Sequence, residues 1–156
     1  MDDKKKYSLS EVKIKISNYC ARQERCHKEV QEKLKVLGVD YKHTDHLIAY
    51  LIEHNFLNES RFAKLYARSK FNQMSWGWNK IRKGLYEKGI LEYCVKEAYQ
   101  EINKEDYENR LAELMEKKRN SLSGHHLEVK KKLFAYLVQK GYEYELIKNK
   151  FKEIHD

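Results

Sequence analysis

The sequence contains no proline, and only six of its 156 residues are glycine. Proline breaks helices because it lacks a backbone N–H and clashes with the preceding turn. A chain without proline that is rich in Lys, Glu, Leu and Tyr is therefore expected to be helical throughout. No apolar run approaches the ~18 residues of a membrane span, and the opening MDDKKKYSLSEV lacks the apolar stretch of a signal peptide. We expect a cytoplasmic protein without membrane contact.

Cysteine is also scarce, and its placement excludes the common metal sites. The three cysteines are an odd number in a chain of this size, so reduced thiols are the expected state. Cys20, Cys26 and His27, together with His125 and His126, could form a metal site, but their spacing matches no zinc-type cysteine pair. We expect Cys20 and Cys26 to fill a core edge or a helix cap, and we expect no bound metal.

The motifs of catalysis are missing as well. The glycines form neither a phosphate-binding loop nor a dinucleotide fingerprint. Neither G-x-S-x-G nor H-E-x-x-H occurs, and no carboxylate pair or Cys/His set indicates catalysis. The sequence therefore predicts a protein that is not an enzyme and needs no cofactor.

One pattern occurs three times. An apolar residue, a leucine four positions later and a glycine four further on are followed by an apolar or aromatic residue, and the glycines are Gly38, Gly89 and Gly141. The glycines lie 51 and 52 residues apart. Apolar residues at i and i+4 share one helix face, and glycine then supplies the left-handed conformation that ends the helix. With a helix before and a helix after each pattern, the repeating unit is three helices.

The predicted fold is all-α, an elongated curved array of three tandem three-helix repeats, because a unit of ~50 residues buries too little core alone and must stack on its neighbours. The expected divisions are a tail over 1–8 and repeats over 9–57, 58–104 and 105–156. Ser8-x-x-Glu11 is a capping-box pattern for the first helix. Thr44 and Asn58 are the expected N-caps of two later helices. A connector is expected over 72–76 and a loop over 120–124.

Basic residues concentrate in the middle of the chain. The net charge is +8, and residues 61–91 carry +7 of it, with Glu87 the one acid among them. The eight basic residues of this segment are Arg61, Lys64, Arg68, Lys70, Lys80, Arg82, Lys83 and Lys88. Basic residues interleaved with aromatics suit a phosphate backbone and exposed bases. We expect these eight to bind nucleic acid or a filament, the alternative being a solvated face.

Within this segment, Arg61, Lys64 and Arg68 recur at i, i+3 and i+7 and form one helical stripe. Nothing local is expected to require Lys64, Arg68, Lys80 or Lys83. Trp76 and Trp78 lie at the connector and are expected to pack in the core. A second basic cluster over 117–119 and 130–132 is expected to be plain surface.

Three stretches of the sequence resemble the RecX family of regulatory proteins. Residues 21–34, ARQERCHKEVQEKL, are similar to that family's A-R-R-x-x-S-x-x-E-L-x-x-K-L; residues 55–63, NFLNESRFA, to G-[YF]-[LI]-[ND]-D-x-R-F-A; and residues 76–90 to G-x-x-x-I-x-x-x-L-x-x-K-G-[IV]. Cys26 replaces the family's serine, and a thiol is a poor cap acceptor, but Glu29 keeps half of the capping box. At Asn58 the family's usual acid is an amide, which caps a helix equally well.

The resemblance implies a crescent of three three-helix repeats that lies in the groove of the RecA–DNA filament. It implies modulation, usually inhibition, of the recombinase in DNA repair and the SOS response, with weaker direct binding to single- or double-stranded DNA. We expect a monomer. The alternative is a stand-alone DNA-binding protein with helix-turn-helix-like units, although no helix shows a clear base-reading set of Arg, Asn and Gln. A structural adaptor for an acidic partner is a third candidate.

Overall fold

The computed structural model describes residues 6–155, and over that range it contains nine α-helices and no strand. The all-α class predicted from the missing proline is confirmed. The helices are α1 (Leu9–Arg22), α2 (His27–Val36), α3 (Tyr41–Glu53), α4 (Glu59–Met74), α5 (Trp78–Glu87), α6 (Glu92–Tyr99), α7 (Lys104–Ser121), α8 (His126–Lys140) and α9 (Tyr144–His155).

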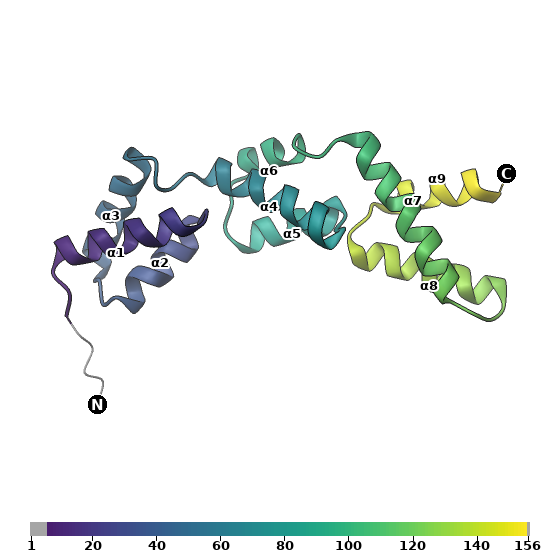
Figure 1. Ribbon diagram of the computed structural model, residues 1–156, viewed down its shortest axis with the longest axis horizontal. Coiled ribbons are helices and arrows are strands. Elements are labelled where there is room, and N and C mark those ends of the chain that lie inside the picture. Colours follow the sequence, from purple (N-terminus) through teal and green to yellow (C-terminus); the bar gives the residue numbers. More distant parts are fainter. Residues whose placement is uncertain (1–5, 156) are drawn as a thin grey trace, which may run out of the picture.

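The helices form three groups of three that follow one another along the long axis of the molecule (Figure 1). The extensive helix–helix contacts all lie inside a group: α1 with α2, α2 with α3, α4 with α5 and α6, α5 with α6, α7 with α8, and α8 with α9. The elongated array of three-helix repeats predicted from the spacing is confirmed.

The repeated glycines lie at equivalent helix ends. Gly38, Gly89 and Gly141 have φ values of +81°, +73° and +104°, a region that a side chain would strain. The N–H of the residue after each glycine donates to the carbonyl of the leucine four positions before that glycine: Val39 to Leu34 at 3.0 Å, Ile90 to Leu85 at 3.1 Å and Tyr142 to Leu137 at 3.1 Å. This is the bond of a Schellman cap, and it confirms the predicted equivalence.

Two expected caps form and one does not. Ser8 accepts from the Glu11 N–H at 3.2 Å, and Asn58 caps α4. Thr44 is not an N-cap, because α3 begins one turn earlier and Asp40 accepts from the His43 N–H at 3.2 Å. Asp40 follows the glycine turn almost directly, so its carboxylate reaches the free N–H groups first.

The two expected loops are shorter than predicted. Helix α4 continues through 74 because Phe71 still packs in the core and Ser75, with φ +56°, makes the left-handed turn. Helix α7 likewise continues through 121, so the loop that follows spans only residues 122–125.

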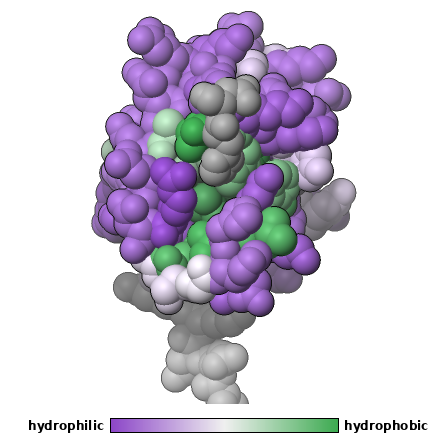
Figure 2. All heavy atoms as spheres, turned by 90° about the vertical axis from the view of Figure 1, so that its right-hand side faces the viewer, coloured by the Kyte–Doolittle hydropathy of each residue, from purple (hydrophilic) through white to green (hydrophobic). Residues whose placement is uncertain are grey.

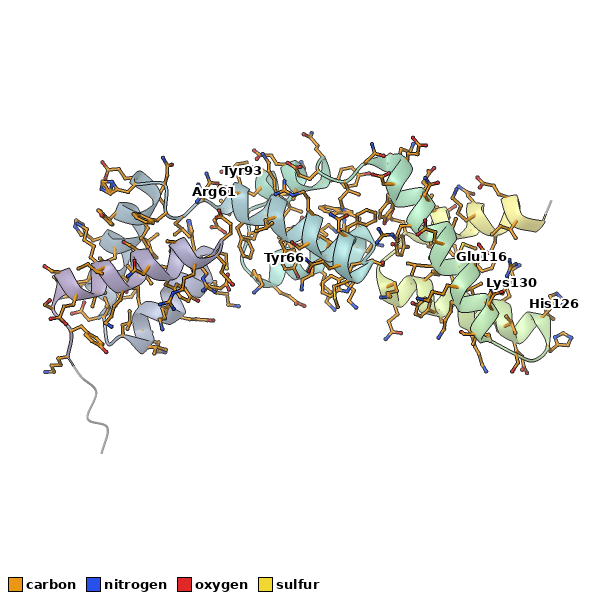
Figure 3. The ribbon with its side chains drawn as sticks, viewed as in Figure 1. Arg61, Tyr66, Tyr93, Glu116, His126 and Lys130 are labelled. Carbon is orange, nitrogen blue, oxygen red and sulfur yellow. The ribbon has the colours of Figure 1, made fainter. Side chains whose placement is uncertain are left out.

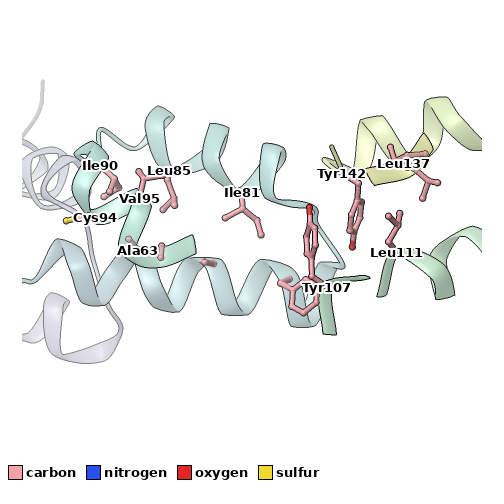
Figure 4. Close-up of a cluster of buried hydrophobic side chains, with 14 of the residues drawn as sticks. Ala63, Ile81, Leu85, Ile90, Cys94, Val95, Tyr107, Leu111, Leu137 and Tyr142 are labelled. Atoms are coloured by element: carbon pink, nitrogen blue, oxygen red, sulfur yellow. The ribbon is translucent and has the colours of Figure 1, made fainter. Parts of the chain in front are cut away.

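The buried side chains form two cores. One lies within α1–α3, including Ile16, Leu34 and Leu51, and closes on itself. The other runs without interruption through α4–α9 and joins Ile81 and Leu85 to Leu137 (Figure 4). The second and third groups are therefore one packed body, whereas the first group is a separate one that meets it at α4 and α5.

Candidate polyanion-binding site

The eight basic residues singled out from the sequence do not share one face. Arg61, Lys64 and Arg68 lie along α4 toward α6 and the first group, while Lys70, Lys80 and Lys83 gather around the α4–α5 connector. Figure 3 shows Arg61 at the start of α4 and Tyr66 further along that helix.

The α4 stripe has local acidic partners. The Arg61 Nε lies 2.7 Å from the Glu24 Oε1, the Lys64 Nζ lies 3.8 Å from the Glu97 Oε2, and the Arg68 Nη1 lies 3.4 Å from the Glu101 Oε2. The expectation that Lys64 and Arg68 have no local role is wrong. Glu24 comes from the loop before α2, Glu97 from α6 and Glu101 from the turn after α6, and these segments meet α4 only in the tertiary structure. The stripe is thus largely neutralised within the molecule.

A hollow of about 480 Å³ lies where α4, α5 and the end of α8 meet, and we call it the middle groove. Lys80 and Lys83 line it from α5, Tyr66 from α4, Trp76 from the connector and Val138 from α8. The sequence did not predict the α8 wall, which comes from more than 50 residues further along the chain.

Lys80, which lines the middle groove, and Lys70 of α4, which does not, both lie over the ring of Trp76. The Nζ atoms of Lys80 and Lys70 lie 4.6 and 4.9 Å from the ring centroid of Trp76, close enough for cation–π attraction. Neither these lysines nor Lys83 forms an ion pair with a carboxylate in residues 6–155. Glu87 is the acid in the lining. The groove therefore keeps a net positive charge next to a half-buried indole.

The other aromatic residue of the middle groove is Tyr66. Its hydroxyl points toward α5, and a Cβ on Gly84 would lie 2.1 Å from that oxygen. Burial raises the pKa of Tyr66, so its hydroxyl stays protonated and available as a donor. Both Trp76 and Trp78 pack against the core, as expected, although Trp76 also faces the groove.

Arg82 and Lys88 do not line the middle groove. The Arg82 Nη2 lies 3.4 Å from the Asn79 Oδ1, and Arg82 borders a different hollow with Trp78. Lys88 lies near the buried thiol of Cys26, whose pKa burial raises to about 11 while Lys88 opposes the shift. Binding by these two residues stays a prediction.

Backbone contacts hold the groove walls together. The Gly77 N–H donates to the Lys140 carbonyl at 2.8 Å, and the Asn79 N–H donates to the Gly141 carbonyl at 2.9 Å. A Cβ on Gly77 would lie 2.3 Å from the Gly141 carbonyl carbon, so no other residue fits there. The start of α5 is thereby joined directly to the end of α8.

Among the side chains that the structure describes, no group of three or more His, Cys, Asp or Glu could hold a metal ion. The three cysteines are free and buried. Cys26 occupies the N-cap position of α2 and Cys20 the core of the first group, as expected, and burial raises the pKa of each to about 11. None of the described helices is both long and apolar enough to cross a bilayer.

Family models match two of the three helix groups. The model described as "RecX, second three-helix domain" matches residues 58–98, and "RecX, third three-helix domain" matches residues 105–150. Together they cover more than half of the chain.

Similar proteins and a solved structure point to the same family as the two matched domains. The chain is 33% identical over 132 residues to the regulatory protein RecX of Clostridium botulinum, a match that covers 83% of this chain and 61% of the relative. It is 31% identical over 144 residues to that of Bacillus cytotoxicus, covering 92% of this chain and 53% of the relative. The chain thus spans only about three-fifths or less of these relatives' length.

The structure resembles the crystal structure of RecX from Lactobacillus salivarius with a TM-score of 0.84 and 26% identity, over 94% of this chain and 96% of that one. The resemblance of the motifs, the two matched domains and the shared fold lead to one conclusion: the chain belongs to the RecX family of regulatory proteins.

Proposed function

We propose that this protein binds a RecA–DNA filament and inhibits the recombinase without being an enzyme itself. The observation that carries the proposal is the middle groove, which Lys80 and Lys83 line and where Lys80 and Lys70 lie over the ring of Trp76. None of the three lysines has a described acidic partner. Unpaired lysines favour a polyanion, and an adjacent indole favours exposed bases. Family membership supports the choice of a regulatory role over a catalytic one.

The mechanism that we propose is occupation of the filament's helical groove. An elongated array can make several modest contacts along a polymer at once, and such contacts multiply into avidity. The middle groove would supply the contact to the polyanionic interior of the filament. Its walls belong to the packed body of α4–α9, so its lysines are held ready before binding, which lowers the entropic cost.

The same groove suits free single-stranded DNA, which makes a stand-alone DNA-binding protein the second candidate. Three lysines beside one tryptophan offer few phosphate contacts, so we expect this binding to be the weaker of the two. We expect no ATP hydrolysis by the protein alone.

Co-sedimentation tests the proposal. The protein is spun with RecA assembled on single-stranded DNA with a nonhydrolysable ATP analogue, with the DNA alone, and with RecA alone. We expect retention mainly with the assembled filament, together with a lower rate of strand exchange. Equal retention with DNA alone would favour the stand-alone DNA-binding protein, and no retention in any sample would refute both candidates.

A further inference from the structure

A second hollow lies on the third helix group, away from the middle groove. It measures about 570 Å³ and lies between α8 and α9, and we call it the terminal groove. Its apolar surface comes from Leu127, Phe134, Tyr144 and Phe151. Figure 2 shows this end of the molecule, where apolar side chains gather and are ringed by hydrophilic ones.

The floor of the terminal groove is unusually apolar for a surface. Leu127 and Tyr144 are 55% and 59% exposed, although both are large. The Phe134 ring lies 4.8 Å from that of Tyr144 and 5.9 Å from that of Phe151, so the aromatic side chains hold one another in place. Covering such a fixed apolar surface with a partner's side chain lowers the free energy of the complex, because apolar area is removed from water.

Four lysines form the rim of the terminal groove, and no acidic residue lines it. They are Lys130 and Lys131 from α8 and Lys148 and Lys152 from α9. All four are exposed, and none makes an ion pair with a carboxylate among residues 6–155. The contrast with α4 is direct, because Lys64 and Arg68 there each face a glutamate. The sequence predicted that Lys130 and Lys131 are plain surface residues, but both line the terminal groove.

The floor favours a peptide over a nucleobase. The ring of Phe151 is stacked on Phe134 and has the Lys130 Nζ 5.7 Å from its centroid, so its faces are already used. Base stacking needs an open ring face. Leu127 is aliphatic and packs better against an aliphatic or aromatic side chain.

We propose that the terminal groove binds an acidic segment of a partner protein, with a bulky apolar side chain entering between α8 and α9 and flanking carboxylates pairing with the four lysines. The proposal goes beyond the filament contact at the middle groove and uses different residues. A peptide of this kind satisfies both features of the groove at once, the apolar floor and the unpaired positive rim.

Fluorescence anisotropy tests the proposal with a short fluorescein-labelled peptide in which glutamates flank one leucine and one phenylalanine. A second peptide carries serine at both apolar positions, and a labelled oligothymidylate is the third probe. The variant Lys131→Glu/Lys148→Glu reverses two rim charges. The control Lys104→Glu/Lys117→Glu makes the same charge change at two exposed lysines of α7 outside the groove.

We expect the rim variant to bind the apolar peptide about tenfold more weakly, because each substitution removes an attraction and adds a repulsion. The control should bind the same peptide less than about twofold more weakly. Leu127→Ser should weaken the same peptide about threefold and leave the serine peptide unchanged. Circular dichroism checks that each variant keeps its helices.

Three results would overturn the proposal. The serine peptide could bind the parent protein as tightly as the apolar peptide, which would mean that the apolar floor contributes nothing and that charge attraction alone holds the peptide. The rim variant could weaken oligothymidylate more than peptide, which would make this a nucleic-acid site. Sedimentation could show that the parent self-associates and Leu127→Ser does not, which would make a second copy of this chain the occupant.

Discussion

The two junctions between helix groups consist of different kinds of contact. At the first, between α1–α3 and α4–α6, polar and charged side chains meet across the boundary. The Arg61 Nε contacts the Glu24 Oε1 at 2.7 Å, and the His27 Nδ1 lies 3.0 Å from the Glu59 Oε1. Glu24 and Glu59 each keep one buried carboxylate oxygen without a described partner. Such an oxygen has lost its water without gaining a hydrogen bond, which costs free energy.

At the second junction, between α4–α6 and α7–α9, buried aromatic side chains with hydrogen-bonded hydroxyls meet. The Tyr107 hydroxyl accepts from the Trp78 N–H at 2.9 Å and donates to the Glu143 carboxylate. The Tyr142 hydroxyl donates to the Ser75 carbonyl at 2.9 Å. Burial raises the pKa of Tyr107 and of Tyr142, so both hydroxyls remain protonated donors.

The difference shows which part of the array is built to stay fixed. The second junction continues the core from α4 to α9 and forms the wall of the middle groove. The first junction relies on the partly exposed Arg61–Glu24 ion pair and on the His27–Glu59 contact. Partly exposed ion pairs contribute little and weaken with salt. Among the buried residues of the first helix group that the structure describes, only Cys26 packs in the second core. We infer that the first group can shift relative to the other two while the groove keeps its shape.

The largest effect is expected for Gly77→Ala at the second junction. The added methyl would lie 2.3 Å from the Gly141 carbonyl carbon, and backbone cannot move aside as a side chain can. We expect a loss of about 3 kcal/mol or more in the free energy of unfolding, measured by urea titration with tryptophan fluorescence. Both tryptophans lie at this junction, so the signal reports it.

Gly84→Ala is the matched control for that substitution. Its methyl would meet the Tyr66 hydroxyl at 2.1 Å, but that is the far end of a side chain, and alanine is favoured over glycine inside a helix such as α5. We expect a change within about 1 kcal/mol. Equal losses for Gly77→Ala and Gly84→Ala would contradict the backbone contact.

Tyr107→Phe should have the next largest effect. It leaves the Trp78 N–H and the Glu143 carboxylate without their shared partner in a half-buried place, at a cost of about 1–3 kcal/mol. The same urea titration measures it. Tyr99→Phe removes the hydroxyl of an exposed tyrosine and should change the midpoint little. A Tyr107→Phe variant as stable as the parent would show that the hydroxyl does not hold the junction.

Arg61→Gln at the first junction should cost less, about 0.5 kcal/mol, because the Arg61 and Glu24 side chains are 43% and 25% exposed. The expected sign of opening is faster proteolysis in the connector over 54–58, in the variant and also in the parent at high salt. Mass spectrometry of the fragments measures the rate. An unchanged cleavage rate would mean that the ion pair does not close this junction.

At neutral pH the smallest free-energy effect concerns the thiols, because they are protonated in the folded and in the unfolded chain alike. A pKa of about 11 for Cys20 and Cys26 leaves about one thiolate in a thousand at pH 8, so labelling needs opening. Cys26 should be labelled before Cys20, because opening of the first junction separates Cys26 from the second core and leaves Cys20 inside the core of the first group. Both folded pKa values lie above the unfolded value near 9, so stability is present below pH 9 and falls toward pH 11. Peptide mapping that finds Cys20 labelled first would contradict the separable junction.

The sequence could predict what is local. The Leu-x-x-x-Gly repeat marks helix ends by bonds that span five residues, so the sequence alone is enough to place Gly38, Gly89 and Gly141 at helix ends. The α3 start was misplaced because two good caps, Asp40 and Thr44, lie four residues apart and local preference does not separate them.

The candidate site was only half predictable for a physical reason. The basic residues are visible in the sequence, but their neutralisation is not, since Glu97 and Glu101 reach α4 only when α6 packs on it. The α8 wall of the middle groove is equally non-local. The signals that pointed to it are Gly77, placed between two tryptophans, and Gly141 of the repeat, which meet at the backbone.

The measurement that tests the central claim most directly is filament binding by Lys80→Glu/Lys83→Glu across a salt series. The control is Lys35→Glu/Lys104→Glu, at two exposed lysines that do not line the groove. Contacts with a phosphate backbone make affinity fall steeply with salt. We predict that the groove variant binds about tenfold more weakly at low salt, with a shallower salt dependence and unchanged unfolding, while the control binds as the parent does. If the groove variant matched the parent at every salt concentration, the middle groove would not be the contact surface.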